Sequence, residues 1–208
     1  MLAIHHGCGK QLRFSDRLRP VCGSAAGFYR LTVTTALTAK RGWALALATA
    51  VVILDRLTKW YIQHSLSAFD HIPVLPDLLC IVHVENPGAA FGFLAEGNPT
   101  LRGLILIGVS FLVMCLVVAA LWMRNVTDES SINFLALGSI LGGAGGNLYD
   151  RIVHGTVTDF IEVFHGAWSF PAFNVADSAI TVGAACLLLN TLLRPSHEDR
   201  KETLKALR

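Results

Sequence analysis

Four aspartates lie inside or at the ends of segments that are otherwise apolar enough to cross a lipid bilayer. They are Asp55, Asp150, Asp159 and Asp177. A carboxylate in or beside hydrocarbon is costly unless it is paired, hydrated or neutralised, so such acids mark functional sites by default. Four of them in one short chain predict a site whose chemistry is that of carboxyl groups.

Two of these acids have an amide side chain on the same face of their helix. Asn147 precedes Asp150 by three residues, and Asn174 precedes Asp177 by three, a spacing that brings side chains together on a helix. An amide can hold a carboxylate in a fixed orientation. Asparagine and aspartate also cap helix ends or meet interfacial water, so one pair alone is ambiguous, and its repetition favours a functional site.

The acid of the first apolar segment has basic neighbours. Asp55 and Lys59 are four residues apart and are expected to form an ion pair within one helix. Arg56 is expected to extend outward to the membrane surface. We expect a structural role for this group.

The elements that must position these residues are membrane helices. Hydrophobic residues make up 53% of the 208 residues, charged residues make up 15%, and the mean hydropathy is +0.52. This composition favours a membrane protein over a soluble domain. Four segments approach the length of about 20 residues that a bilayer core requires. They cover residues 43–62, 103–123, 132–149 and 170–193, with Pro171 in the opening turn of the fourth.

Lysine and arginine predict the orientation of these helices, because they are enriched in cytoplasmic flanks. Seven basic residues precede the first span and five follow the fourth, whereas residues 64–101 contain none. Both termini are therefore expected in the cytoplasm. Asp55 then lies about 18 Å into the first span, and Asp177 lies about 9 Å into the fourth when counted from Pro171, at about 1.5 Å per residue. All four acids are expected near the outer leaflet.

Two further patterns describe packing and the outer loop. Gly138, Gly142 and Gly146 repeat at four-residue spacing, which predicts close contact with another helix. Between residues 72 and 84, β-branched apolar residues occur together with two prolines, and an Asn-Pro-Gly turn follows. This pattern indicates short strands around the turn. The expected fold is an all-α membrane protein with four transmembrane helices and a small extracytoplasmic β-containing loop region.

Two carboxyl groups held close together can carry out acid–base chemistry on their own. Two of them in a partly dehydrated site share a proton near neutral pH. The ionised group then activates water as a general base while the protonated group polarises the carbonyl. Arg151 can orient a substrate carbonyl through its planar guanidinium.

Other hydrolytic chemistries have less support. The sequence has no GxSxG or HExxH motif, and its five scattered cysteines indicate neither a disulfide framework nor a CxxC site. Several histidines on the outer side leave a metal site with the aspartates to be considered, but their spacing matches no metal motif. These are His64, His71, His83, His154 and His165. We expect neither a metal nor another cofactor.

Five motifs occur in order and together resemble those of the bacterial lipoprotein signal peptidase family, signal peptidase II. They are Asp55-Arg-Leu-Thr-Lys59, Asn86-Pro-Gly-Ala-Ala-Phe91, Gly142-Gly-Ala-Gly-Gly-Asn-Leu-Tyr-Asp-Arg151, Val157-Thr-Asp159-Phe160 and Phe173-Asn-Val-Ala-Asp177. Each motif is weak alone, but the ordered set is highly specific. The resemblance covers residues 43–194.

The resemblance implies an intramembrane aspartic endopeptidase that removes the signal peptide from diacylglyceryl-modified prolipoproteins. Such an enzyme cuts on the N-terminal side of the lipidated cysteine. The motifs place Asp159 and Asp177 at the catalytic pair and seven other residues in a substrate-binding or supporting shell. These seven are Asn86, Asn147, Asp150, Arg151, Asn174, Asp55 and Lys59.

The expected setting is the bacterial cytoplasmic (inner) membrane, with the active site near the outer leaflet. Partners are lipidated prolipoprotein substrates and membrane lipids. A net charge of +2 does not suggest nucleic acid, and we expect a monomer. The expected organisation is a disordered basic cytoplasmic extension (1–41), a four-helix membrane peptidase domain (42–194) and a charged cytoplasmic tail (195–208).

Two other classes remain open from the residues themselves. An ion- or proton-coupled transporter also uses intramembrane aspartates, although it would be expected to place them near the midplane and to show internal repeats. A non-catalytic membrane scaffold would need no clustered acids. Cleavage of a lipidated precursor peptide without added metal distinguishes a peptidase from both.

Overall fold

The computed structural model describes residues 22–68, 70–88, 98–123 and 130–193. Contacts divide the chain into two units, Met1–Leu37 and Thr38–Arg208. The second unit contains every described element except the first part of α1. The elements in chain order are α1 Cys22–Ser65, β1 His71–Leu75, β2 Leu79–Asn86, α2 Pro99–Trp122, α4 Ser131–Val153, β3 Val157–His165, β4 Trp168–Phe173 and α5 Val175–Leu192.

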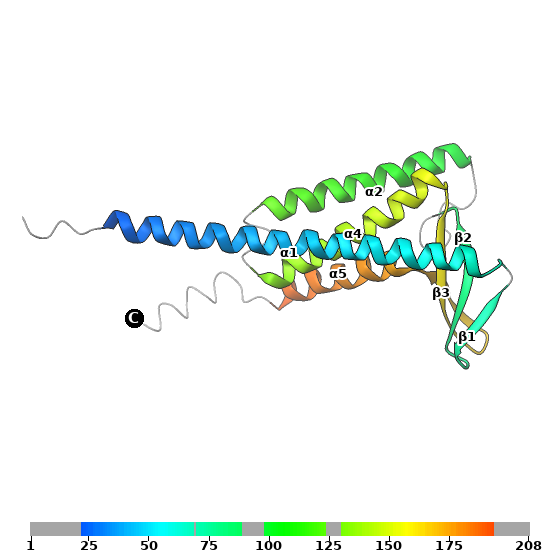
Figure 1. Ribbon diagram of the computed structural model, residues 1–208. Coiled ribbons are helices and arrows are strands. Elements are labelled where there is room, and N and C mark those ends of the chain that lie inside the picture. The colour runs from blue at the N-terminus through cyan, green and yellow to red at the C-terminus, as the bar shows by residue number, and fades with distance from the viewer. Residues whose placement is uncertain (1–21, 69, 89–97, 124–129, 194–208) are drawn as a thin grey trace, which may run out of the picture. The chain divides into compact units, whose positions relative to one another are not determined.

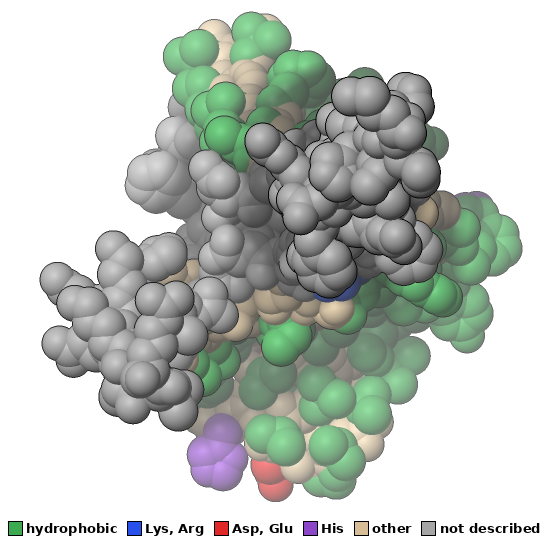
Figure 2. All heavy atoms as spheres, turned by 90° about the vertical axis from the view of Figure 1, so that its left-hand side faces the viewer, with side chains coloured by type: hydrophobic (Ala, Val, Ile, Leu, Met, Phe, Trp, Pro, Cys, Tyr) green, Lys and Arg blue, Asp and Glu red, His purple; other side chains and the backbone are tan. Residues whose placement is uncertain are grey.

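Within the second unit the helices lie side by side and the strands gather at one end of the bundle (Figure 1). Three helical segments among the described residues are long and apolar enough to cross a membrane, Leu37–Ser65, Pro99–Trp122 and Val175–Leu192. Their large apolar side chains are widely exposed, as lipid-facing surfaces are and as soluble surfaces rarely are. Figure 2 shows mostly hydrophobic side chains on the described part of the face in view.

Helix α4 is the interior helix of the bundle. Twelve of its 23 residues are buried, and its many glycines lower its hydropathy. Glycine serves close packing here: a Cβ on Gly138 would lie 2.4 Å from the carbonyl oxygen of Ala44, and one on Gly142 would lie 2.6 Å from that of Ala48. The predicted close helix contact is therefore confirmed, with α1 as the partner.

Helix α2 has well-defined ends. Asn98 caps its N-terminus by accepting hydrogen bonds from the N–H groups of Thr100 and Leu101. At the other end the guanidinium of Arg41 on α1 donates to the carbonyl oxygens of Leu121 and Trp122, at 3.0 and 3.3 Å. A basic residue thus satisfies the free carbonyls of a helix C-terminus.

The four strands form one antiparallel sheet in the order β1-β2-β3-β4. The sequence predicted strands only around residues 72–84, and the structure adds β3 and β4. Asp159, which falls between the third and fourth predicted spans, therefore lies on a strand. Pro171 lies in β4 and not in the opening turn of the last helix, because an edge strand tolerates the missing N–H of proline.

Two predicted boundaries differ from the structure. The last helix begins at Val175, after the cap residue Asn174, so Asp177 lies in the first helical turn and not about 9 Å below the helix start. Helix α1 begins at Cys22, so residues 22–41 of the predicted disordered extension are helical. Residues 1–21 of the predicted extension and the predicted tail 195–208 lie outside the described residues.

Candidate active site

The four aspartates meet at the sheet end of the helix bundle. Asp55 comes from α1, Asp150 from α4, Asp159 from β3 and Asp177 from the first turn of α5. The first three are at most 3% exposed, and Asp177 is half-buried. The tertiary structure thus brings the predicted acids together.

Asp159 is held by two amides. Asn86 Nδ2 at the end of β2 donates to Asp159 Oδ2 at 2.9 Å, and Asn174 Nδ2 donates to Asp159 Oδ1 at 2.6 Å. Burial raises the pKa of Asp159 to about 6, with the hydrogen bond from Asn86 opposing this shift and the negative charge of Asp177 adding to it. A carboxyl group with that pKa can exchange protons readily near neutral pH.

Asp177 is fixed by the start of its own helix and by α4. Asn174 and Asp177 form a capping box, in which Asp177 N–H donates to Asn174 Oδ1 at 2.9 Å and Asn174 N–H donates to Asp177 Oδ2 at 3.3 Å. Asn147 Nδ2 donates to Asp177 Oδ1 at 2.7 Å. Asn174 is therefore a helix cap, and because it bonds to both Asp159 and Asp177 this one residue links the two candidate acids.

A buried lysine joins the remaining acids to this network. Lys59 Nζ lies 2.8 Å from Asp55 Oδ2 and 2.7 Å from Asp150 Oδ2, and it donates to Asn147 Oδ1 at 3.0 Å. These two carboxylate oxygens have no aligned hydrogen-bond donor among the described residues, so the charge of Lys59 holds them. The predicted Asp55–Lys59 ion pair is present and extends to a second helix.

Asp55 also fixes the start of α5. Its Oδ1 accepts a hydrogen bond from the N–H of Ala176 at 3.0 Å, which places a negative charge at the positive end of that helix. Because Asp177 follows Ala176 directly, the position of Asp177 depends on α1 through this bond. Asp55 thus positions the candidate pair from a distance.

The sequence-based expectations for the side chains of Arg56 and Asn147 were wrong. Arg56 does not extend outward: its guanidinium hydrogen-bonds Asp150 and lies 4.5 Å from the centre of the Tyr149 ring. Asp150 is only 1% exposed, and a buried charge without a partner is costly. Arg56 therefore pairs with Asp150 and does not extend to the membrane surface. Asn147 does not hold Asp150, its neighbour on the helix. It holds Asp177 across the helix interface instead.

Arg151 lies between α4 and the segment after β2. Its Nη1 donates to Asn147 O at 3.4 Å and its Nη2 donates to Gly88 O at 3.5 Å, both long bonds. Its buried Nε has no hydrogen-bond partner among the described residues. The guanidinium therefore retains donor capacity for another acceptor.

A second polar cluster, which the sequence did not predict, supports the strand that carries Asp159. Glu85 lies opposite Thr158 in the sheet and accepts hydrogen bonds from the hydroxyls of Thr158 and Thr156, at 2.9 and 2.6 Å. Gln63 Nε2 of α1 donates to Thr158 Oγ1 at 2.7 Å. The only signal for this cluster was the position of Glu85 directly before Asn86.

The histidines do not build a metal site with the acids in the part of the chain that the structure describes. His154 Nδ1 lies 3.7 Å from Asp150 Oδ1, and His83 Nε2 lies 3.1 Å from Glu85 Oε1. The described residues contain one cluster with metal-like spacing, and it includes neither Asp159 nor Asp177. The arrangement of the site is that of two carboxyl groups, each oriented by amides, with a guanidinium nearby.

Apolar helices that carry a pair of amide-bonded carboxyl groups at one end define a membrane protein with a candidate acid–base site. The chain belongs to the signal peptidase II family, because the family model described as Signal peptidase (SPase) II matches residues 47–193. This result confirms the resemblance inferred from the five motifs.

Similar proteins agree over most of their length. The lipoprotein signal peptidase of Solibacter usitatus is 41% identical over 155 residues, which cover 74% of this chain and 93% of that protein. The lipoprotein signal peptidase of Pseudomonas fluorescens is 44% identical over 153 residues, covering 72% and 86%. Two solved structures described as bacterial membrane enzymes have TM-scores of 0.63 and 0.61 at 30% and 31% identity. They cover 73% and 74% of this chain and 88% and 95% of their own.

Proposed function

We propose that this signal peptidase II uses Asp159 and Asp177 to hydrolyse the bond on the N-terminal side of the lipidated cysteine in diacylglyceryl-modified prolipoproteins. The observation that carries this assignment is Asn174, whose side chain bonds Asp159 and whose backbone bonds Asp177. The similar proteins named lipoprotein signal peptidase support the substrate class.

The chemistry follows from two carboxyl groups in a partly dehydrated site. They do not both ionise easily, so they share a proton. The ionised group removes a proton from water, and the protonated group donates a hydrogen bond to the scissile carbonyl. The roles then reverse as the leaving amine is protonated. The proton belongs to the pair, and its titration is a property of both groups.

The supporting residues divide into two groups by what they contact. Arg151 has unused donor capacity and can bind a backbone carbonyl of the substrate. The other group orients the pair and joins the helices that carry it. It consists of Asn86, Asn147, Asn174, Asp55, Lys59 and Asp150.

The protein has a candidate binding site for the lipid part of the substrate close to Asp159. An apolar cavity of about 510 Å³ lies between α1 and the sheet, and its lining includes Leu57, Tyr61, Ile72 and Phe160. Phe160 directly follows Asp159. A cavity of this size and character can take part of an acyl chain while the peptide reaches the carboxyl pair.

The proposed topology has four membrane crossings, with α4 as the interior one. Both termini lie in the cytoplasm of a bacterial cell, in its inner membrane, and the sheet and the acids lie at the outer leaflet. The distribution of basic residues supports this orientation. So does Arg41, which binds the end of α2 opposite to the sheet. The enzyme acts as a monomer that contacts membrane lipids.

Replacing either aspartate by asparagine tests the assignment. An amide keeps the shape of the carboxyl group but cannot exchange the catalytic proton, so Asp159→Asn and Asp177→Asn should each reduce turnover by about 10³-fold. Turnover of a diacylglyceryl-modified precursor peptide would be measured in detergent at matched folded concentration, well below the melting temperature. Asp77→Asn is the control, because Asp77 has a φ of 58° that asparagine adopts readily.

The control should retain wild-type turnover, and turnover of the wild type should continue in a chelator. Both catalytic variants should remain inserted and folded. Near-normal turnover of either variant would contradict the paired-carboxylate mechanism. Loss of wild-type turnover in a chelator would indicate metal-dependent hydrolysis instead.

A further inference from the structure

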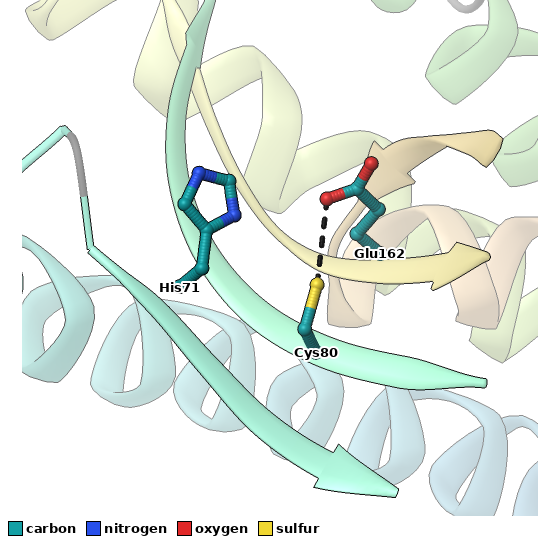
Figure 3. A group of neighbouring side chains, drawn as sticks. All are labelled: His71, Cys80 and Glu162. Atoms are coloured by element: carbon teal, nitrogen blue, oxygen red, sulfur yellow. Dashed lines mark hydrogen bonds between the residues drawn. The ribbon is translucent and has the colours of Figure 1, made fainter. Parts of the chain in front are cut away.

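Three side chains of metal-binding type meet on the sheet, separately from the candidate catalytic pair. They are His71 of β1, Cys80 of β2 and Glu162 of β3, and their ligand atoms all lie within 4.8 Å of one another. Figure 3 shows the imidazole, the thiol and the carboxylate gathered across the three strands. No motif in the sequence connects these residues.

The register of the sheet explains why they meet. Cys80 lies directly opposite Glu162, so their side chains share one face. On the other side of Cys80 the opposite residue is Pro73. His71 is two positions from Pro73 and therefore points to that same face. Three adjacent strands thus each supply one ligand of a different chemical type.

The spacing fits a tetrahedral ion. Cys80 Sγ lies 3.4 Å from Glu162 Oε2. A sulfur and an oxygen bound to tetrahedral zinc at about 2.3 and 2.1 Å would lie about 3.6 Å apart. Bringing the third ligand atom to such a distance requires a movement of His71 only. That side chain is exposed, and its ring has no hydrogen-bond partner among the described residues.

The surroundings also suit an ion. Ser169 Oγ of β4 donates a hydrogen bond to Glu162 Oε1, which orients the carboxylate and leaves Oε2 toward Cys80, as outer partners of metal ligands do. Cys80 is buried and Glu162 is half-buried. The exposed His71 leaves a path for the ion from solvent.

We propose that His71, Cys80 and Glu162 bind one zinc ion, with water as the fourth ligand. Sulfur, imidazole and carboxylate ligands together favour zinc, whereas magnesium and calcium prefer oxygen ligands throughout. The ion ties β1, β2 and β3 to one another. Because β3 also carries Asp159, the zinc stabilises the strand that holds an active-site acid without taking part in hydrolysis.

The test uses the full-length protein in detergent after removal of metal with a chelator. Titration with Co²⁺ should produce the thiolate-to-cobalt charge-transfer absorption at one ion per chain, and zinc should displace the cobalt. Cys80→Ser should abolish this absorption. Glu162→Gln and His71→Ala should each weaken zinc binding by about tenfold or more, since even outer partners of ligands contribute that much. Cys115→Ser, at an exposed free cysteine on α2, is the matched control and should bind as the wild type does.

Thermal unfolding separates a bound ion from a simple S–H···O hydrogen bond. Zinc should raise the melting temperature of the wild type and of Cys115→Ser by the same amount, and at the same zinc concentration it should raise that of His71→Ala by less. His71 is exposed, so its replacement leaves the fold intact even if Cys80→Ser does not fold. Absence of the cobalt absorption, or zinc stabilisation as large in His71→Ala as in the wild type, would overturn the proposal. Turnover well below the melting temperature should be the same with zinc and with chelator.

Discussion

Replacing Lys59 by methionine should destabilise the fold more than any single change at the catalytic pair. The Lys59 side chain is 0% exposed, and its Nζ lies 2.8 Å from Asp55 Oδ2 and 2.7 Å from Asp150 Oδ2. Removing one partner of a buried ion pair costs about 3–5 kcal/mol, because the other charge stays buried without compensation. Asp150 retains Arg56 as a partner. Asp55 retains the hydrogen bond from the N–H of Ala176. Because each acid keeps one partner, we expect the free energy of unfolding to fall by about 3–5 kcal/mol in total and not by that amount for each acid.

A double-mutant cycle measures this effect. The free energy of unfolding would be determined by denaturant titration in detergent for Lys59→Met, Asp55→Asn and the double variant. Asparagine removes the charge of Asp55 but can still accept the hydrogen bond from Ala176, so the double variant should recover about 1–3 kcal/mol relative to Lys59→Met. A Lys59→Met protein within about 1 kcal/mol of the wild type, or no coupling in the cycle, would refute this account of the network.

Three further predictions concern the geometry and the titration of the site. Gly146→Ala should lower both stability, by about 1–3 kcal/mol, and turnover, because its Cβ would lie 2.6 Å from Asp55 Oδ2, whereas a Cβ on Gly145 meets nothing closer than 3.6 Å. Equal melting temperatures and turnover for the two alanine variants would contradict this. Burial raises the folded-state pKa of Asp159 from 3.8 to about 6, so its contribution to stability is complete below pH 3.8 and is lost as the pH rises through about 6. The loss is about 3 kcal/mol, and unfolding measured against pH should show it in the wild type and show a smaller loss in Asp159→Asn. Asn86→Ala removes a hydrogen bond to the charged carboxylate and should therefore move the acid inflection of kcat/KM to higher pH; an unchanged or lower inflection would rule this out.

The sequence by itself determined those features of the protein that depend on residues close together in the chain. Long apolar segments make helices of membrane-spanning length whatever they contact, so the helices were predictable within a few residues apart from the first. The four-residue spacing of Asp55 and Lys59 places them on one helix face, so their ion pair was predictable too. The same holds for the glycine spacing of α4 and for the Asn174–Asp177 pair at the start of α5. The ordered motifs were sufficient to predict the family.

Only the tertiary structure decided which groups meet across elements. Asn147 binds Asp177 rather than its helix neighbour Asp150, because the helix interface offers Asp150 two cations and offers Asp177 an amide. Pro171 belongs to a strand because β4 lies at the edge of the sheet and has a neighbouring strand, β3, on one side only. An edge strand tolerates the missing N–H of proline.

The His71, Cys80 and Glu162 group has the same origin, because strand register joins residues that are far apart in the chain. Such contacts depend on distances between elements, and helical or strand periodicity describes only the positions of residues within one element.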